Sequence, residues 1–171
     1  CRVQLVVSVL LLSGAGGRIE AGQSTVPAEF EEQLVSIGFG PSLEASMDIY
    51  RPLLAVAPTD GVEVRKGFTY GDHVRHKLDV YQPTGQTDVP VMVYVHGGGY
   101  SSGDRDLNEE VYGNIPTYFA RQGLLGINAS YRLAPEARWP SGAEDMRAVV
   151  AWVKRQATRY GGVPDRIFLM G

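Results

Sequence analysis

The sequence predicts an α/β fold from three observations on its second half. Residues 89–96 and 124–130 are nearly continuous apolar runs, with the length and β-branched content expected of strands buried on both faces. A third run of this kind begins at Ile167. Between the runs, residues 109–121 and 141–160 place apolar side chains on one face of a helix. This alternation of strands and helices predicts parallel strands joined by right-handed crossovers.

Two further strands are expected before these elements. Residues 62–70 and 74–81 carry apolar side chains at alternate positions, as a partly exposed hairpin does. Gly71 and Asp72 lie between them and form a dipeptide typical of tight turns. We therefore expect an outer hairpin beside three central parallel strands, with helices on both faces of the sheet.

The N-terminal segment differs from the rest of the chain. Arg2 precedes an apolar run at residues 3–12, which small residues follow at 13–17. This order is typical of a secretory signal peptide, and the run is too short to span a bilayer. A strand or a translated cloning remnant is the alternative. We expect residues 1–21 to be a signal or apolar N-terminal segment, and the protein to be secreted or periplasmic, otherwise cytoplasmic.

The next part of the chain is expected to be helical. A capping residue near Ser24 and the apolar stripe that follows it predict a first helix. Apolar residues on one side predict a second helix from about residue 41 to residue 57. Because both precede every expected strand, residues 22–58 are interpreted as N-terminal helices that belong either to a cap or to the packing on the rim of the domain. Residues 59–171 then form the α/β domain.

The composition is that of a soluble globular protein, with 44% hydrophobic and 20% charged residues. The net charge of −3 gives no reason to expect nucleic acid or an anionic membrane as a partner. Cys1 is the only cysteine, which excludes an internal disulfide and a cysteine-based metal cluster. Because the first residue is not Met, we expect the N-terminus to be incomplete.

Three consecutive glycines follow the first buried strand. That strand ends in His96, and Gly97, Gly98 and Gly99 come directly after it. Ligands of open α/β sheets bind at the carboxyl ends of the strands. Glycines there can adopt unusual backbone angles and leave their N–H groups pointing into the site. Such donors stabilise the oxyanion of an acyl-transfer intermediate, and a strand followed by His-Gly-Gly-Gly is the lipase and esterase form of this oxyanion hole.

Four motifs in order give the chain a resemblance to a known family. They are His96-Gly97-Gly98-Gly99, Tyr131-Arg132-Leu133-Ala134-Pro135-Glu136, Trp139-Pro140 with Glu144-Asp145, and Pro164-Asp165-Arg166-Ile167-Phe168-Leu169-Met170-Gly171. Their order and spacing resemble the hormone-sensitive-lipase-type and related feruloyl and acetyl esterases of the α/β-hydrolase superfamily, over residues 60–171.

The resemblance implies the N-terminal half of an α/β-hydrolase sheet and places an oxyanion hole at the glycines. In the family the second and third glycines of the motif supply the N–H donors, which here are those of Gly98 and Gly99. His96 and Gly97 would support them.

The resemblance also implies that the nucleophile, the acid and the base are not in this chain. Gly171 stands where the first glycine of G-x-S-x-G falls, and the family's serine, acid and histidine follow that point. The stretch 131–136 and Asp145 would shape loops rather than take part in catalysis. We therefore expect a chain truncated before the nucleophile elbow and inactive by itself.

Two other candidate sites are rejected. Residues 99–103 also fit G-x-S-x-G, but Ser101 lies five residues after His96, enters a polar loop and has no histidine after it. His73 and His76 are three apart on an expected strand, so their side chains point to opposite faces and cannot chelate one metal. No metal site is predicted.

Together these features predict a carboxylic ester hydrolase that forms an acyl-enzyme on a serine, acting on small-molecule esters without metal or organic cofactor. An amidase of the arylformamidase kind would use the same machinery. A non-catalytic binding domain on the same fold is the alternative from another class. A phosphate-binding loop is disfavoured, because the chain lacks the P-loop lysine and Ser102 stands where G-x-G-x-x-G needs its third glycine.

Overall fold

The computed structural model describes residues 28–38, 43–107 and 109–171, and the expected signal segment lies outside them. The elements in chain order are α1 (Ala28–Ile37), α2 (Leu43–Ala55), β1 (Val62–Thr69), β2 (Lys77–Pro83), β3 (Val89–Val95), the π-helix η1 (Glu109–Gly113), α3 (Asn114–Arg121), β4 (Leu125–Ala129), α4 (Ser141–Gln156), the 3₁₀-helix η2 (Ala157–Tyr160) and β5 (Gly162–Met170). The contacts divide the chain into two units, residues 1–50 and 51–171, which are described separately.

In the first unit, α1 has the single apolar face that its sequence predicts. Phe30, Leu34 and Ile37 are half-buried, while the other residues of the helix are exposed. The first turn holds Glu29 and Glu31, whose charges favour the positive end of the helix dipole.

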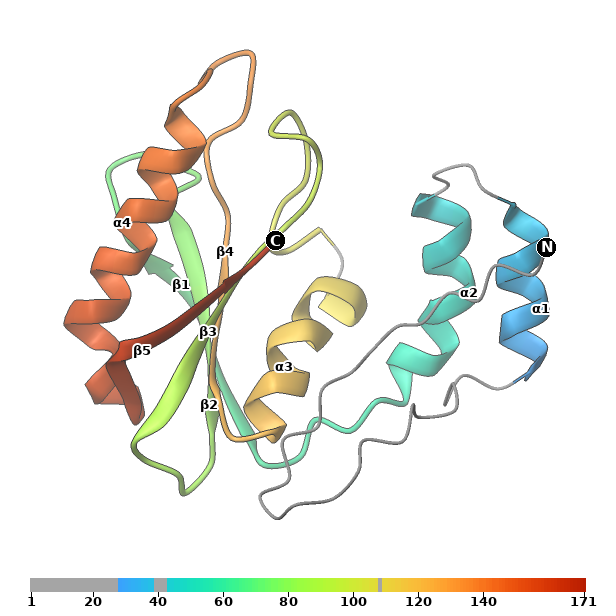
Figure 1. Cartoon of the computed structure of the whole chain (residues 1–171), viewed down its shortest axis with the longest axis horizontal. Coiled ribbons are helices and arrows are strands. Elements are labelled where there is room, and N and C mark those ends of the chain that lie inside the picture. The colour runs from blue at the N-terminus through green and yellow to red at the C-terminus, as the bar shows by residue number, and fades with distance from the viewer. Residues whose placement is uncertain (1–27, 39–42, 108) are drawn as a thin grey trace, which may run out of the picture. The chain divides into compact units, whose positions relative to one another are not determined.

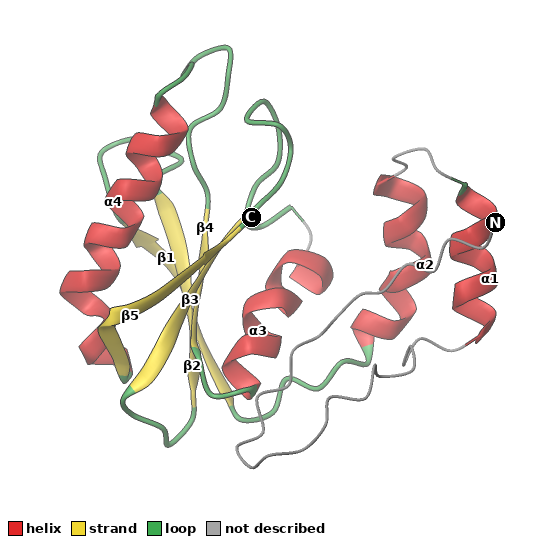
Figure 2. Cartoon of the chain, in the orientation of Figure 1, coloured by secondary structure: helices red, strands yellow, loops and turns green. Residues whose placement is uncertain are grey.

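The second unit is built on a five-stranded sheet in the order β1-β2-β4-β3-β5 (Figure 2). β1 pairs with β2, and β2 with β4, in antiparallel fashion, whereas β3 pairs in parallel with both β4 and β5. The outer hairpin and the three parallel strands are therefore confirmed. Strands β2, β4 and β3 each have a neighbour on both sides, and β1 and β5 form the two edges of the sheet.

Helices cover both faces of this sheet, with α4 on one side and α3 on the other (Figure 1). The side chains of β4 alternate accordingly. Leu125 and Ile127 join a core with Val149 and Val153 of α4. On the opposite face, a Cβ on Gly126 would lie 2.8 Å from the carbonyl oxygen of Pro116 in α3, so this glycine lets α3 approach the strand closely.

The helix expected at residues 109–121 has a different register from the one predicted. It begins as a single π-turn and becomes α-helical only at Asn114. A π-turn closes i to i+5 rather than i to i+4, so it shifts the face that the following residues present. The apolar pattern at 109–121 predicts Tyr118 on the inward face of the helix. After this shift Tyr118 is 42% exposed, while Pro116 and Ala120 are buried.

The connection between β1 and β2 is longer than the two-residue turn expected at Gly71 and Asp72. β2 begins only at Lys77, and residues 70–76 form a loop in which the N–H of His76 donates to the carbonyl of His73. The expectation that His73 and His76 lie on a strand is therefore wrong.

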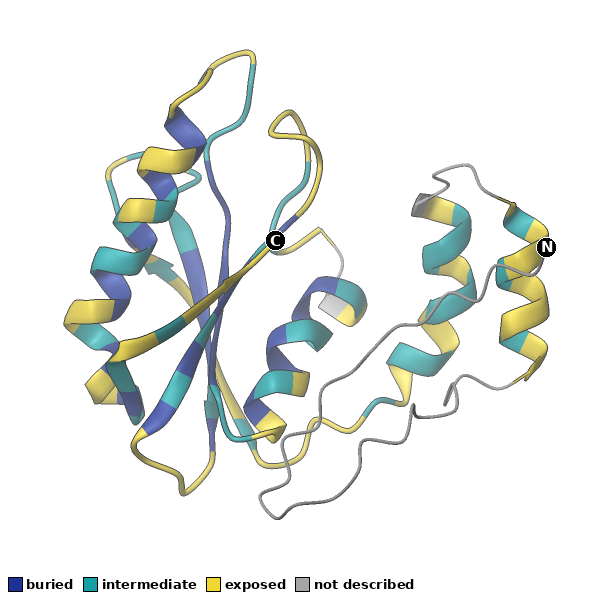
Figure 3. Ribbon diagram, viewed as in Figure 1, coloured by how far each residue is buried: buried dark blue, intermediate teal, exposed yellow. Residues whose placement is uncertain are grey.

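Burial is uneven along β5. Its first residue, Gly162, is buried, but most residues near its end are exposed (Figure 3). Phe168 and Leu169 are 56% and 55% exposed, and the outer edge of β5 has no neighbouring strand among the described residues. None of the helices in the described ranges is long and apolar enough to cross a bilayer.

Candidate oxyanion-hole site

The segment after β3, residues 96–103, forms a tight loop that we call the glycine loop. Three consecutive residues in it have positive φ: Gly98 at 121°, Gly99 at 59° and Tyr100 at 61°. The carbonyl of Gly98 accepts the N–H groups of both Ser101 and Ser102, each at 3.1 Å. A Cβ on Gly98 would lie 2.2 Å from the carbonyl oxygen of Ser102. Only glycine therefore fits at position 98 in this turn.

The turn leaves the two predicted donors available. Within the described part of the chain, no acceptor takes the N–H of Gly98 or of Gly99. Backbone N–H groups held without an internal partner at the end of a parallel strand can bind an anionic oxygen. The role of Gly98 and Gly99 as oxyanion donors stays a prediction, and the close approach of Ser102 explains why position 98 requires glycine.

His96, at the start of this loop, is buried and contacts it through a hydrogen bond. Its side chain is 2% exposed, and its ring stacks on Tyr131 with centroids 4.4 Å apart. Nδ1 lies 2.8 Å from the carbonyl of Gly97, which can only accept, so Nδ1 carries the hydrogen. Burial lowers the pKa of His96 below its ordinary value, which keeps the ring neutral. The hydroxyl of Tyr131 donates to the backbone carbonyl of His96 at 3.0 Å.

A charge cluster lies behind the end of the loop. Asp104 accepts the hydroxyl of Ser130 at 2.9 Å, and the guanidinium groups of Arg75 and Arg105 lie 3.0 and 3.5 Å from its carboxylate. Burial would raise the pKa of Asp104, but these contacts and the N–H of Asp106 hold it below its usual value. Sequence reasoning missed this cluster, because its members come from separate segments whose proximity no local pattern indicates.

The Tyr-Arg-Leu-Ala-Pro-Glu stretch is joined to α4 through Asp145. The N–H and the guanidinium of Arg132 donate to the carboxylate of Asp145, at 2.8 and 2.9 Å. Nε2 of His76 lies 3.0 Å from the same carboxylate. Burial raises the pKa of Asp145, and the contacts with Arg132 and His76 outweigh that effect and lower it. These residues bind one another rather than an open site, in keeping with the loop-shaping role that the resemblance implies.

Ser101 has no features of a nucleophile. Its hydroxyl donates to the carbonyl of Gly98 at 3.2 Å, and no imidazole in the described residues contacts it. His73 and His76 are neighbours, with ring centroids 5.4 Å apart, in contrast to the opposite faces expected of them. Nevertheless the described residues hold no group of three or more histidine, cysteine, aspartate or glutamate side chains arranged to bind a metal ion.

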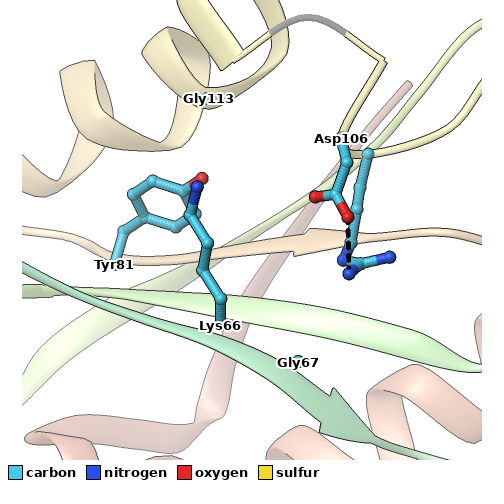
Figure 4. A pocket seen from close by; sticks show the side chains of 6 residues that line it. Lys66, Gly67, Tyr81, Asp106 and Gly113 are labelled. Atoms are coloured by element: carbon cyan, nitrogen blue, oxygen red, sulfur yellow. Dashed lines mark ion pairs between the residues drawn. The ribbon is translucent and has the colours of Figure 1, made fainter.

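A cavity of about 300 Å³ lies beside the antiparallel strands (Figure 4). Lys66, Gly67, Tyr81, Arg105, Asp106 and Gly113 line it. Figure 4 shows the carboxylate of Asp106 against a guanidinium, and the two atoms Nη2 of Arg105 and Oδ2 of Asp106 are 2.8 Å apart. The glycine loop does not line this cavity, so it is separate from the candidate oxyanion hole.

Comparisons with known proteins identify a family and similar esterases. The model of the BD-FAE family matches residues 78–171. A carboxylesterase of Mycobacterium tuberculosis, NlhH, is 36% identical over 96 residues, which are 53% of this chain and 28% of that protein. Esterase B of Lactobacillus rhamnosus shares the fold with a TM-score of 0.60 and 23% identity, over 84% of this chain and 45% of that one. A bacterial heroin esterase gives a TM-score of 0.59 and 26% identity, over 85% and 48%. The chain thus spans less than half the length of each of these relatives.

Proposed function

The chain belongs to the BD-FAE family, and from this membership we propose that the whole protein hydrolyses carboxylic esters of small molecules. The observation that carries the proposal is the pair of unpartnered N–H groups, of Gly98 and Gly99, at the end of β3. Attack on an ester places negative charge on the carbonyl oxygen, and two fixed donors lower the energy of that transition state. Similar proteins that are named esterases support the same reaction.

The proposed mechanism uses a serine nucleophile and a histidine base, with an acyl-enzyme as intermediate. We propose that these groups belong to a part of the whole protein after Gly171. A Cβ on Gly171 would lie 2.7 Å from Cγ2 of Val95, the residue before His96. The end of β5 and the start of the glycine loop are therefore neighbours. A serine two positions after Gly171 would enter the site at the edge where Gly98 and Gly99 lie.

The test is the hydrolysis of short-chain nitrophenyl esters by the whole protein, beside an aryl formamide as the amide substrate. We expect ester turnover and a covalent fluorophosphonate adduct on a serine beyond Gly171, located by mass spectrometry. An adduct on Ser101 would contradict the proposed nucleophile. Faster turnover of the formamide would identify an amidase, and a protein with neither turnover nor adduct would be a binding domain.

We further propose that the protein is exported, from the order of charged, apolar and small residues at positions 2–17. In a secreting host, the mature protein should begin near Ala15 to Ala21, which N-terminal sequencing of the exported fraction would measure. Recovery of exported protein with the apolar run intact would contradict this proposal.

A further inference from the structure

One side chain joins the glycine loop to two other segments. Arg75, in the loop before β2, donates from Nε to the carbonyl of Tyr131 and from Nη2 to the carbonyl of Gly103, both at 2.7 Å. Its Nη1 lies 3.0 Å from the carboxylate of Asp104. The guanidinium thus uses all three of its nitrogens, on acceptors from two segments, and the side chain is 24% exposed.

The glycine loop needs support of this kind from outside. Gly97, Gly98 and Gly99 have no side chains that could pack, and the positive φ of Tyr100 is unfavourable for a residue with a Cβ. Such a conformation persists only where its surroundings fix it. At its centre the loop is held by the bond from the N–H of Ala134 to the carbonyl of Tyr100, at 2.8 Å. At its end the carbonyl of Gly103 is held by Arg75.

The second acceptor of Arg75 connects it to the base of the same loop. Tyr131, whose carbonyl it binds, stacks on His96 and donates its hydroxyl to the carbonyl of His96. The guanidinium therefore ties the end of the loop to the residue that supports its beginning. An arginine suits this place because its planar head offers several donors in a fixed arrangement, which a lysine does not.

We propose that Arg75 is a positioning residue for the oxyanion hole, holding Gly98 and Gly99 in their donor geometry through Gly103, Asp104 and Tyr131. The expected loss of turnover rests on the proposed function. The role of Arg75 in holding the glycine loop does not. Donors of an oxyanion hole act on the transition state more than on the bound substrate, so their displacement lowers kcat with little change in KM. A displacement near 1 Å can cost about 10²-fold in rate.

The experiment compares Arg75→Gln, Arg75→Lys and Arg75→Ala in the whole protein with Arg121→Gln as the matched control. Arg121 is bound to the exposed Asp60 and makes no contact with the glycine loop. We expect kcat for a nitrophenyl ester to fall about 10- to 100-fold in Arg75→Gln with KM within about threefold, and Arg121→Gln to be unchanged. Arg75→Lys should remain impaired, and methylguanidinium should restore part of the activity of Arg75→Ala.

Hydrogen exchange gives a readout that does not need turnover. The N–H groups of Ser101 and Ser102 should exchange faster in Arg75→Gln than in the wild type, while peptides from α4 stay protected. If the wild type hydrolyses no ester, the proposed function fails, and the exchange data alone decide the inference. Unchanged kcat and unchanged exchange in Arg75→Gln would overturn it. Full activity in Arg75→Lys would overturn it too, since a single positive charge would then suffice. If Arg75→Gln does not fold, the other two variants test the inference. An impaired Arg75→Lys and a partial rescue of Arg75→Ala by methylguanidinium would support it, and a fully active Arg75→Lys or no rescue would contradict it.

Discussion

At the scale of single residues, the glycine loop depends on backbone angles that ordinary residues avoid. Gly98 and Gly99 both have positive φ, but they differ in their surroundings. A side chain on Gly98 would collide with the backbone of Ser102, whereas a Cβ on Gly99 would have nothing within 4 Å. Backbone conformation therefore favours glycine at both positions, and the lack of space requires it at position 98 as well.

This difference predicts unequal effects of alanine at the two positions. Gly98→Ala should lower the turnover of the whole protein about 10²-fold or more, because the loop must open to admit the Cβ and the donors move with it. Gly99→Ala keeps its N–H and meets no neighbour, so its loss should be at least tenfold smaller. Steady-state kinetics on one nitrophenyl ester would measure both, and equal losses would contradict the steric explanation.

His96 predicts a pH dependence of stability. Burial lowers its pKa below the ordinary value of 6.5, so between the two values the unfolded chain binds more protons than the folded one. The stability that His96 contributes is therefore fully present above pH 6.5 and decreases as the pH falls through that value.

The measurement is the free energy of unfolding in urea between about pH 5 and about pH 8. His96→Asn keeps an N–H donor for the carbonyl of Gly97 and removes the titration. We expect the variant to have a flatter profile than the wild type in this range. The same slope in both proteins would mean that another group causes it.

At the scale of elements, the packing of α3 on β4 depends on a glycine. Gly126→Ala would place a Cβ 2.8 Å from the carbonyl oxygen of Pro116 and 3.1 Å from Cβ of Tyr81. We expect the free energy of unfolding to fall by about 1–3 kcal/mol, the usual cost of overpacking. Gly97→Ala is the control, since its Cβ would meet nothing within 4 Å, and its effect on stability should be under about 0.5 kcal/mol.

The elements also show what a sequence can predict here. β3 and β4 were predictable, because strands covered on both faces need uninterrupted apolar residues such as those from Val91 to Val95. The inward face of α3 was not predictable. The π-turn before Asn114 rotates the helix, and no pattern in the sequence indicates that turn. The loop at His73 was mistaken for strand because Val74 continues an alternation that the backbone does not follow.

The candidate site divides in the same way. Gly98 and Gly99 could be proposed from the sequence, because the chemistry of the motif needs two N–H groups at one place in the chain. Arg75 was not, because its importance lies in contacts with Gly103 and Tyr131, which are 28 and 56 positions away. Contacts over such distances depend on the assembled sheet and not on local periodicity.

At the scale of the whole molecule, the edge formed by β5 predicts how this chain behaves alone. Phe168, Leu169 and Met170 are 56%, 55% and 42% exposed, on a strand with one edge unpaired in the described structure. Edges of this kind associate with other chains. We expect the 171-residue chain to self-associate and to bind hydrophobic dyes.

Sedimentation velocity over a range of concentrations would measure this association. Phe168→Lys should reduce it, because a charge on the exposed edge opposes pairing and replaces a side chain that contributes little to the core. A monomer at all concentrations, with no dye binding, would contradict the prediction.

The strand order has a consequence for the synthesis of the protein. β2 and β3 follow one another along the chain, yet in the sheet β4 lies between them and pairs with both. A nascent chain that has emerged only as far as β3 must keep these two strands apart, or pair them wrongly as a hairpin. Correct assembly then waits for residues 125–129 to leave the ribosome and enter the gap. Limited proteolysis of stalled nascent chains should therefore show β2 and β3 becoming resistant together, and only after β4 has emerged.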